Sequence, residues 1–129
     1  MNQEGFKYDG IQNALTERFP EIWPRIERAF GSYYDLDHEL PEAYPTLEDV
    51  FKSMIWEQLD QLGADISLLN RIFKFLEEMA ESQDPEVPNL LWIAILERLA
   101  FNKNRLARAW THMGEATKQL ALEIIKARS

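Results

Sequence analysis

Few side chains in this 129-residue sequence are of the types that catalyse reactions or bind metal ions. Cysteine is absent, and the two histidines, His38 and His112, lie far apart in the chain. Neither has a Glu-x-x-His or His-x-x-x-His neighbour, the helical spacing that gathers ligands in di-metal carboxylate proteins. The sequence therefore predicts no metal site, no cofactor and no thiolate chemistry.

Carboxylates are common, but few of them are placed as catalytic pairs. Glu77 and Glu78 are adjacent in sequence, and Glu97 lies in a segment that is otherwise apolar. We interpret Glu97 as the ion-pair partner of a neighbour such as Arg71 or Arg98, because a carboxylate in an apolar region needs a partner. Such a pair would hold the core in register, and it is weak evidence for catalysis.

His112 shares one helical row with Arg105 and Arg108. This row could hold an anion, but pairing with acidic residues in the first part of the chain is the favoured interpretation. No glycine-rich phosphate loop, nucleophile elbow or basic-aromatic strip is present in the sequence. We therefore expect a protein that is not an enzyme.

Charge is divided unevenly along the chain. Residues 1–89 contain 19 acidic and 7 basic residues, a net charge of −12, whereas residues 90–129 contain 3 and 7, a net charge of +4. The overall charge of −8 disfavours nucleic acid as a partner and favours a cationic one. The alternative is a solvated acidic face that only keeps the protein in solution.

The apolar residues recur with a period near 3.6 along most of the chain, and alternating strand patterns are absent. We predict an all-α fold, in which about six to seven antiparallel helices form a compact bundle or a short solenoid-like stack in one domain, residues 1–129. The predicted helices cover residues 8–19, 21–30, 46–63 and 65–81, followed by one after Pro85, one after residues 101–104 and a terminal one after Gly114.

Two of these helices carry further predictions. Thr46 is expected to cap the third helix, and Gly63 to close it. The fifth helix contains Leu90–Leu96, which is apolar on all sides, and we expect it to be surrounded by other helices at the centre of the fold.

The third predicted helix has an unusual polar side. Asp49, Ser53, Trp56 and Asp60 are spaced i, i+4, i+7 and i+11, so they share a row opposite the apolar stripe. The row places a tryptophan among carboxylates, with Glu57 next to it. Trp56 is therefore a candidate contact for another protein, and packing beneath a neighbouring loop or the N-terminal helices is the alternative.

Residues 32–45, between the second and third helices, form the main predicted irregular segment, and they are rich in tyrosines and acids. We predict that this segment and the row on the third helix together bind a partner, with aromatic anchors and steering carboxylates. The candidate residues are Tyr33, Tyr34, Asp35, Asp37, Glu39, Tyr44, Asp49, Trp56, Glu57 and Asp60.

The longest apolar run is far shorter than the ~20 residues that a membrane span needs, and the first residues do not form a signal peptide. We expect a soluble, cytoplasmic protein that does not contact a membrane and exists as a monomer or a weak homo-oligomer.

Several short motifs resemble those of a family of small all-helical bacterial proteins of unknown function. They are Arg18-Phe19-Pro20-Glu21, Phe75-Leu76-Glu77, Asp84 with Glu86-Val87 and Asn89-Leu90, Leu96-Glu97 with Leu99, and Met113-Gly114. The similarity spans most of the chain, but the segment from Tyr33 to Thr46 departs from the pattern. Members of the family resemble the immunity proteins that accompany bacterial polymorphic or contact-dependent toxins.

The resemblance implies a protein that neutralises a cognate toxin domain by binding alone. Many such toxin domains are nucleases with basic clefts, which an acidic helical protein can occupy in place of the substrate. The expected partner is therefore a toxin domain with a basic surface. The alternative is a non-enzymatic helical scaffold or adaptor that mediates self-association or assembly.

Overall fold

The computed structural model describes residues 5–31, 41–61 and 63–128, and all regular elements in these ranges are helical. They form seven successive helices, which confirms the predicted all-α bundle. In chain order these are α1 (Ile11–Arg18); η1 (Pro20–Ile22) with α2 (Trp23–Phe30); α3 (Ala43–Pro45), η2 (Thr46–Phe51) and α4 (Lys52–Asp60); α5 (Ile66–Ala80); α6 (Glu86–Leu91), η3 (Trp92–Leu96) and α7 (Glu97–Leu99); α8 (Lys103–Trp110); and α9 (Glu115–Arg128).

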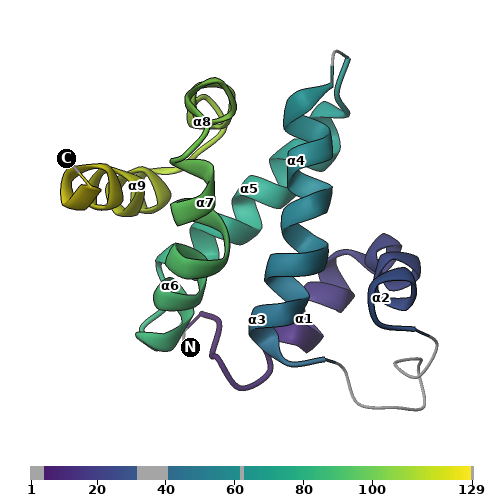
Figure 1. Cartoon of the computed structure of the whole chain (residues 1–129). Helices are drawn as coiled ribbons and strands as arrows, with labels where there is room; N and C mark the ends of the chain where they lie inside the picture. Colours follow the sequence, from purple (N-terminus) through teal and green to yellow (C-terminus); the bar gives the residue numbers. More distant parts are fainter. Residues whose placement is uncertain (1–4, 32–40, 62, 129) are drawn as a thin grey trace.

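Two long helices organise the bundle, one over residues 43–60 and the other over residues 86–99 (Figure 1). Each contains a π-helical stretch, and the two stretches, η2 and η3, contact each other. Helix α5 contacts both long helices, through α4 and α6. The remaining helices pack around this frame: α2 on η2, α8 on α4 and α7, and α9 on α5 and η3.

The core is centred on three phenylalanines from different helices. Phe19, Phe51 and Phe75 are each at most 1% exposed, and their ring centroids lie 5.3 to 5.7 Å apart. Phe75 meets the other two rings edge to face, which is a favourable arrangement of aromatic quadrupoles. This cluster joins the end of α1 to η2 and α5.

The helix that was predicted to begin at Thr46 begins three residues earlier, at Ala43. Pro45 is compatible with this start because it is the third helical residue, where the missing N–H has no intrahelical acceptor. Thr46 is buried, and its hydroxyl donates to the Glu42 carbonyl at 2.8 Å. Thr46 is therefore an interior residue, the prediction that it caps the helix is wrong, and the helix ends at Asp60 and not at Gly63.

The first helix also starts later than predicted, at Ile11 and not at Tyr8. The backbone N–H of Tyr8 donates to the Asp84 carboxylate at 2.8 Å, and Gly10 adopts a φ of 110°, which favours glycine. Residues 5–10 are therefore tied to the turn before α6.

The prediction that the fifth helix is enclosed on all sides is wrong at one strip. Leu90, Leu91 and Ala94 are fully buried, but Ile93 is 36% exposed and Trp92 is half-buried. The strip faces outward because η2 and α9 cover only part of the circumference of η3. Across residues 5–31, 41–61 and 63–128, no helix has the combined length and apolar content that a membrane span requires.

Candidate partner-binding site

The exposed side of η2 and α4 forms a ridge, which we call the α4 ridge and define as Asp49, Ser53, Trp56, Glu57 and Asp60. All five lie on the side of the helix away from the core. Trp56 is half-buried, and the other four residues are exposed. The structure therefore brings together four of the ten predicted partner-binding residues.

The other predicted residues lie elsewhere. Tyr44 is half-buried at the beginning of the same long helix, far from Asp60 at its end, and its hydroxyl accepts a hydrogen bond from the Asn89 amide at 3.3 Å. Its ring lies 6.3 Å from that of Tyr8. The remaining candidates, Tyr33, Tyr34, Asp35, Asp37 and Glu39, lie outside the described residues.

Asp60 links α4 to α8 through two arginines. Arg105 donates from Nε and Nη2 to the two carboxylate oxygens at 3.0 and 2.6 Å, and Arg108 donates from Nη2 at 3.1 Å. The hydrogen bonds from Arg105, assisted by Arg108, hold the pKa of Asp60 below its usual range against the effect of burial. The guanidinium carbon of Arg105 also lies 4.8 Å from the Trp56 ring centroid and covers the ring.

Glu57 is paired in the same way on the other flank of the ridge. Arg25 of α2 donates from both terminal nitrogens to the two oxygens of Glu57, at 2.9 and 2.7 Å, and this hydrogen bonding lowers the pKa of the carboxyl. No residue that the structure describes forms an ion pair with Asp49. Arginines within the fold thus neutralise two of the three ridge carboxylates, and the negative potential expected there is much reduced.

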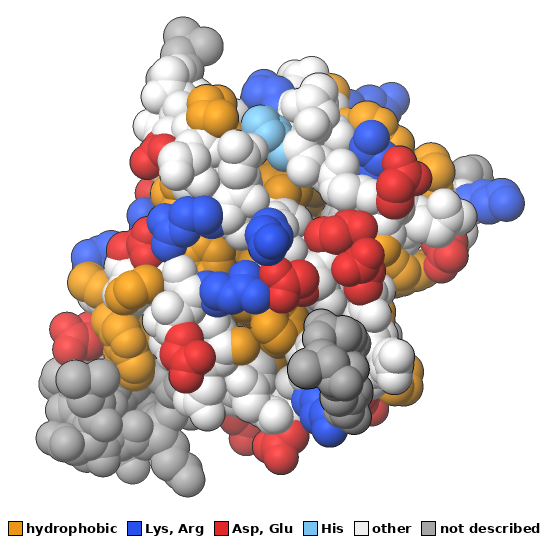
Figure 2. Space-filling model, turned by 180° about the vertical axis from the view of Figure 1, so that it is seen from behind, with side chains coloured by type: hydrophobic (Ala, Val, Ile, Leu, Met, Phe, Trp, Pro, Cys, Tyr) orange, Lys and Arg blue, Asp and Glu red, His pale blue; other side chains and the backbone are white. Residues whose placement is uncertain are grey.

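Ion pairs also join α1 and η1 to α5 on another side of the molecule. Arg18 lies 2.6 Å from Glu78, and Arg71 lies 3.0 Å from Glu21. Figure 2 shows basic and acidic side chains next to one another across the middle of the face opposite to that of Figure 1. Charges are therefore matched between helices here as well.

The prediction for Glu97 is wrong, because both of its expected partners bind elsewhere. Arg71 binds Glu21, and Arg98 lies 3.8 Å from Glu48. Glu97 is half-buried, and it has no ion-pair partner among the residues that the structure describes.

The adjacent carboxylates Glu77 and Glu78 have structural roles. Glu77 accepts hydrogen bonds from the backbone N–H groups of Ala116 and Thr117, at 2.9 and 3.0 Å, and from the Thr117 hydroxyl at 2.8 Å. It therefore caps the N-terminus of α9 from a different helix, while Glu78 pairs with Arg18.

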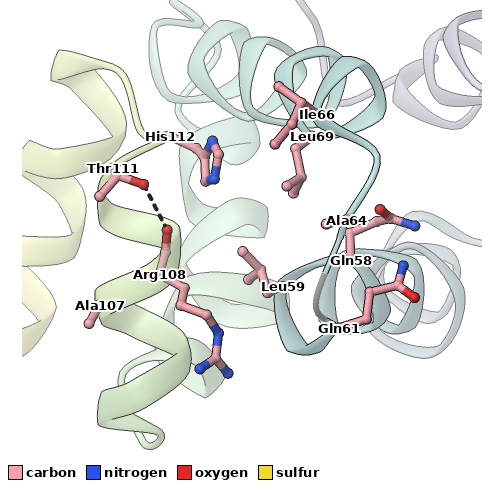
Figure 3. Close-up of a pocket in the computed structure, with 10 residues that line it drawn as sticks. All are labelled: Gln58, Leu59, Gln61, Ala64, Ile66, Leu69, Ala107, Arg108, Thr111 and His112. Carbon is pink, nitrogen blue, oxygen red and sulfur yellow. Dashed lines mark hydrogen bonds between the residues drawn. The ribbon is translucent and has the colours of Figure 1, made fainter.

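A cavity of about 440 Å³ lies beside the ridge, between the end of α4, the connection to α5, the start of α5, and α8 (Figure 3). We call it the α4–α8 groove. Leu59 and Leu69, each 3% exposed, form part of its apolar wall, and Ile66 is 59% exposed at its edge. Ala64 and Ala107 contribute further apolar surface.

The polar side chains of the groove come mainly from α8 and the turn that follows it. Arg108 lies between the groove and Asp60, and the Thr111 hydroxyl donates to the Arg108 carbonyl at 3.1 Å. The His112 ring stacks on Phe73, with ring centroids 5.6 Å apart. This arrangement of a large apolar surface with a few polar groups can bind an apolar group.

The groove was missed by sequence reasoning. Ile66 lies three residues before Leu69 and seven before Phe73, which is the spacing of a buried helix face, so its sequence position does not mark it as exposed. Ile66 is exposed because no described element covers its side of the first turn of α5, and the sequence of α5 carries no signal of this exposure.

Across residues 5–31, 41–61 and 63–128, no group of three or more histidine, aspartate or glutamate side chains is placed to hold a metal ion.

One family model, described as a domain of unknown function (DUF7674), matches residues 13–127. No curated protein and no solved structure matches the chain. The matched span contains every residue of the α4 ridge and of the α4–α8 groove.

Proposed function

The chain belongs to the family of the domain of unknown function DUF7674. We propose that it is an immunity protein that binds and neutralises a bacterial toxin domain. The α4–α8 groove carries this proposal. Stable protein interfaces combine an apolar centre, often aromatic, with a rim of polar groups. The groove supplies the apolar centre, and the ion pairs of Asp60 supply the rim.

The net charge of −8 supports a partner with a basic surface, because opposite charges accelerate the encounter of two proteins. Several exposed carboxylates that the structure describes, Glu42, Asp49 and Glu86 among them, form no ion pair and contribute to this field. The paired carboxylates of the ridge contribute less. Lasting affinity therefore comes from the apolar groove, and the unpaired carboxylates affect mainly the association rate.

The proposal gives the chain no catalytic role. It acts by occupying or covering the active surface of the toxin, so its effect depends on affinity alone.

The direct test mixes the purified protein with the product of the neighbouring gene. We expect a 1:1 complex in size-exclusion chromatography, an association rate that falls as salt rises, and rescue of cells that express the neighbouring gene. Absence of a complex at micromolar concentration, together with absence of rescue, would rule out the proposal for that partner.

A second candidate, a self-associating scaffold, is favoured by one observation. Leu122 and Ile125 are 49% and 39% exposed, and they lie three residues apart on α9, where they share a face. Apolar residues on one exposed helix face favour contact with another chain. Light scattering distinguishes the candidates, since a dimer that persists at high salt supports the scaffold and a monomer at all concentrations excludes it.

A further inference from the structure

The α4–α8 groove differs in charge from the chain as a whole. The protein carries a net charge of −8, but none of the ten residues labelled in Figure 3 is acidic. Arg108 is the basic residue among them, and His112 contributes its imidazole ring. The apolar surface of the groove is thus bordered by one arginine, whose partner Asp60 is shared with Arg105.

Arg108 is also the less tightly held of the two arginines that bind Asp60. Arg105 makes two hydrogen bonds to Asp60, and its side chain is 19% exposed against the Trp56 ring. Arg108 makes one hydrogen bond to Asp60, at 3.1 Å, and its side chain is 50% exposed.

Because of this difference, Arg108 can exchange its hydrogen bond to Asp60 for one to a ligand. A guanidinium has five N–H donors, and one of those of Arg108 is used by Asp60. If Arg108 turns to a ligand, Asp60 keeps both bonds from Arg105, so the link between α4 and α8 persists.

We infer that the groove binds a segment of a partner protein in which a large apolar side chain lies next to a carboxylate. The apolar side chain lies on Leu59, Leu69 and Ile66, and the carboxylate accepts hydrogen bonds from Arg108. A cavity of about 440 Å³ accommodates one such side chain with its flanking backbone. The inference rests on the proposed function, because it names the local contact by which the toxin domain is recognised.

Short peptides test the inference without the toxin. The probes are Ac-Gly-Phe-Asp-Gly-NH2 and its analogues with Asn or Lys in place of Asp, titrated into the ¹⁵N-labelled full chain. We expect the Asp peptide to shift the amide resonances of Ala64, Ile66 and Ala107, with weak affinity. The Asn peptide should bind about tenfold more weakly, because a charge-assisted hydrogen bond is lost, and the Lys peptide more weakly still.

Two variants test which part of the groove contacts the carboxylate of the peptide and which part contacts its apolar side chain. Arg108→Gln should remove the preference for Asp over Asn, and Ala107→Leu should abolish binding of all three peptides by filling the groove. The matched control is Arg28→Gln, which removes an exposed arginine of α2 outside the groove and should leave the preference intact.

Equal binding of the Asp and Asn peptides to the unaltered protein, resonance shifts confined to another surface, or absence of binding at about 10 mM peptide would each overturn the inference. If the toxin complex forms in spite of such a result, the proposed function stands and only the groove contact is wrong. If the Asp peptide binds as expected but no toxin complex forms, the groove contact stands and the proposed function fails.

Discussion

Glu77 shows how one carboxylate can fix a helix in another part of the chain. Its two oxygens accept three hydrogen bonds from the first turn of α9, whose N–H groups would otherwise lack intrahelical acceptors. The negative charge also lies at the positive end of the α9 dipole. Glu77 and Gly114 belong to two of the short motifs that resemble a known family, Phe75-Leu76-Glu77 and Met113-Gly114. In the structure the two residues lie against each other at the start of α9.

Glu77→Gln should lower the free energy of unfolding by about 1 to 3 kcal/mol at pH 7, because hydrogen bonds to a charged acceptor are lost. Burial raises the pKa of Glu77, but the bonds from Ala116 and Thr117 outweigh it, and the net pKa is lowered. A carboxyl whose pKa is lower in the folded state stabilises above its unfolded pKa, and the stabilisation is lost as the pH falls through the folded value. Urea unfolding at pH 7, 5 and 3 should therefore show a difference between wild type and variant that shrinks with acid, and a pH-independent difference would contradict this role.

Gly114 allows the Glu77 carboxyl group to come close to the backbone at the start of α9. A Cβ on Gly114 would overlap the carboxyl group of Glu77, so we expect Gly114→Ala to cost about 1 to 3 kcal/mol of stability. In a Glu77→Ala background the obstruction is gone, and the same substitution should cost much less. A double-mutant cycle measures this coupling, and additive effects would show that Gly114 has a different role.

Sequence reasoning was weakest at the level of single residues. It identified Glu77, Glu78 and Glu97 as noteworthy carboxylates. Glu77, however, binds backbone groups 39 and 40 residues away, Glu78 pairs with Arg18, 60 residues away, and Glu97 has no ion-pair partner among the described residues. Such partners depend on how the helices cross, which local pattern does not specify. The prediction that Arg105 and Arg108 pair with the acidic first part of the chain is confirmed, since both bind Asp60. It could be made because residues 1–89 contain a large excess of acidic residues.

At the scale of elements, the junction of α4 and α8 depends on Arg105. Arg105→Gln removes two hydrogen bonds to Asp60 and the contact with Trp56, and we expect a loss of about 0.5 to 1.5 kcal/mol, since the pair is partly exposed. The indole resonance of Trp56 should shift in the NMR spectrum. Arg98→Gln is the matched control, because Arg98 lies 3.8 Å from Glu48 at an exposed site and should change stability little. Equal effects of the two substitutions would refute the special role of Arg105.

The helices themselves could be predicted well from the sequence, since their apolar period and the break at Gly114 are local signals. The start at Ala43 could not, because Pro45 reads as a helix breaker unless its position in the first turn is known. The groove could not be predicted either, because it depends on which elements leave Ile66 uncovered.

At the scale of the whole molecule, the net charge affects mainly the rate of association with a partner, whereas ion pairs within the fold affect its stability. Asp49→Lys should slow association with a basic partner several-fold at low salt, because Asp49 has no ion-pair partner among the described residues, while stability changes little. Asp60→Lys should in addition destabilise the fold, since it places an ammonium group against Arg105 and Arg108. Stopped-flow association rates and thermal unfolding of both variants separate these effects, and identical behaviour would show that the pairing of Asp60 is unimportant.

The central claim is that the chain neutralises a toxin domain through the α4–α8 groove. The most direct measurement is calorimetric titration of the neighbouring gene's product into three forms: the wild type, Ala107→Leu, which fills the groove, and Ala127→Leu, which adds the same side chain to an exposed site on α9. We predict that the wild type and Ala127→Leu bind equally tightly, and that Ala107→Leu binds at least about tenfold more weakly. Equal affinity of all three forms, or absence of binding to the wild type, would contradict the account.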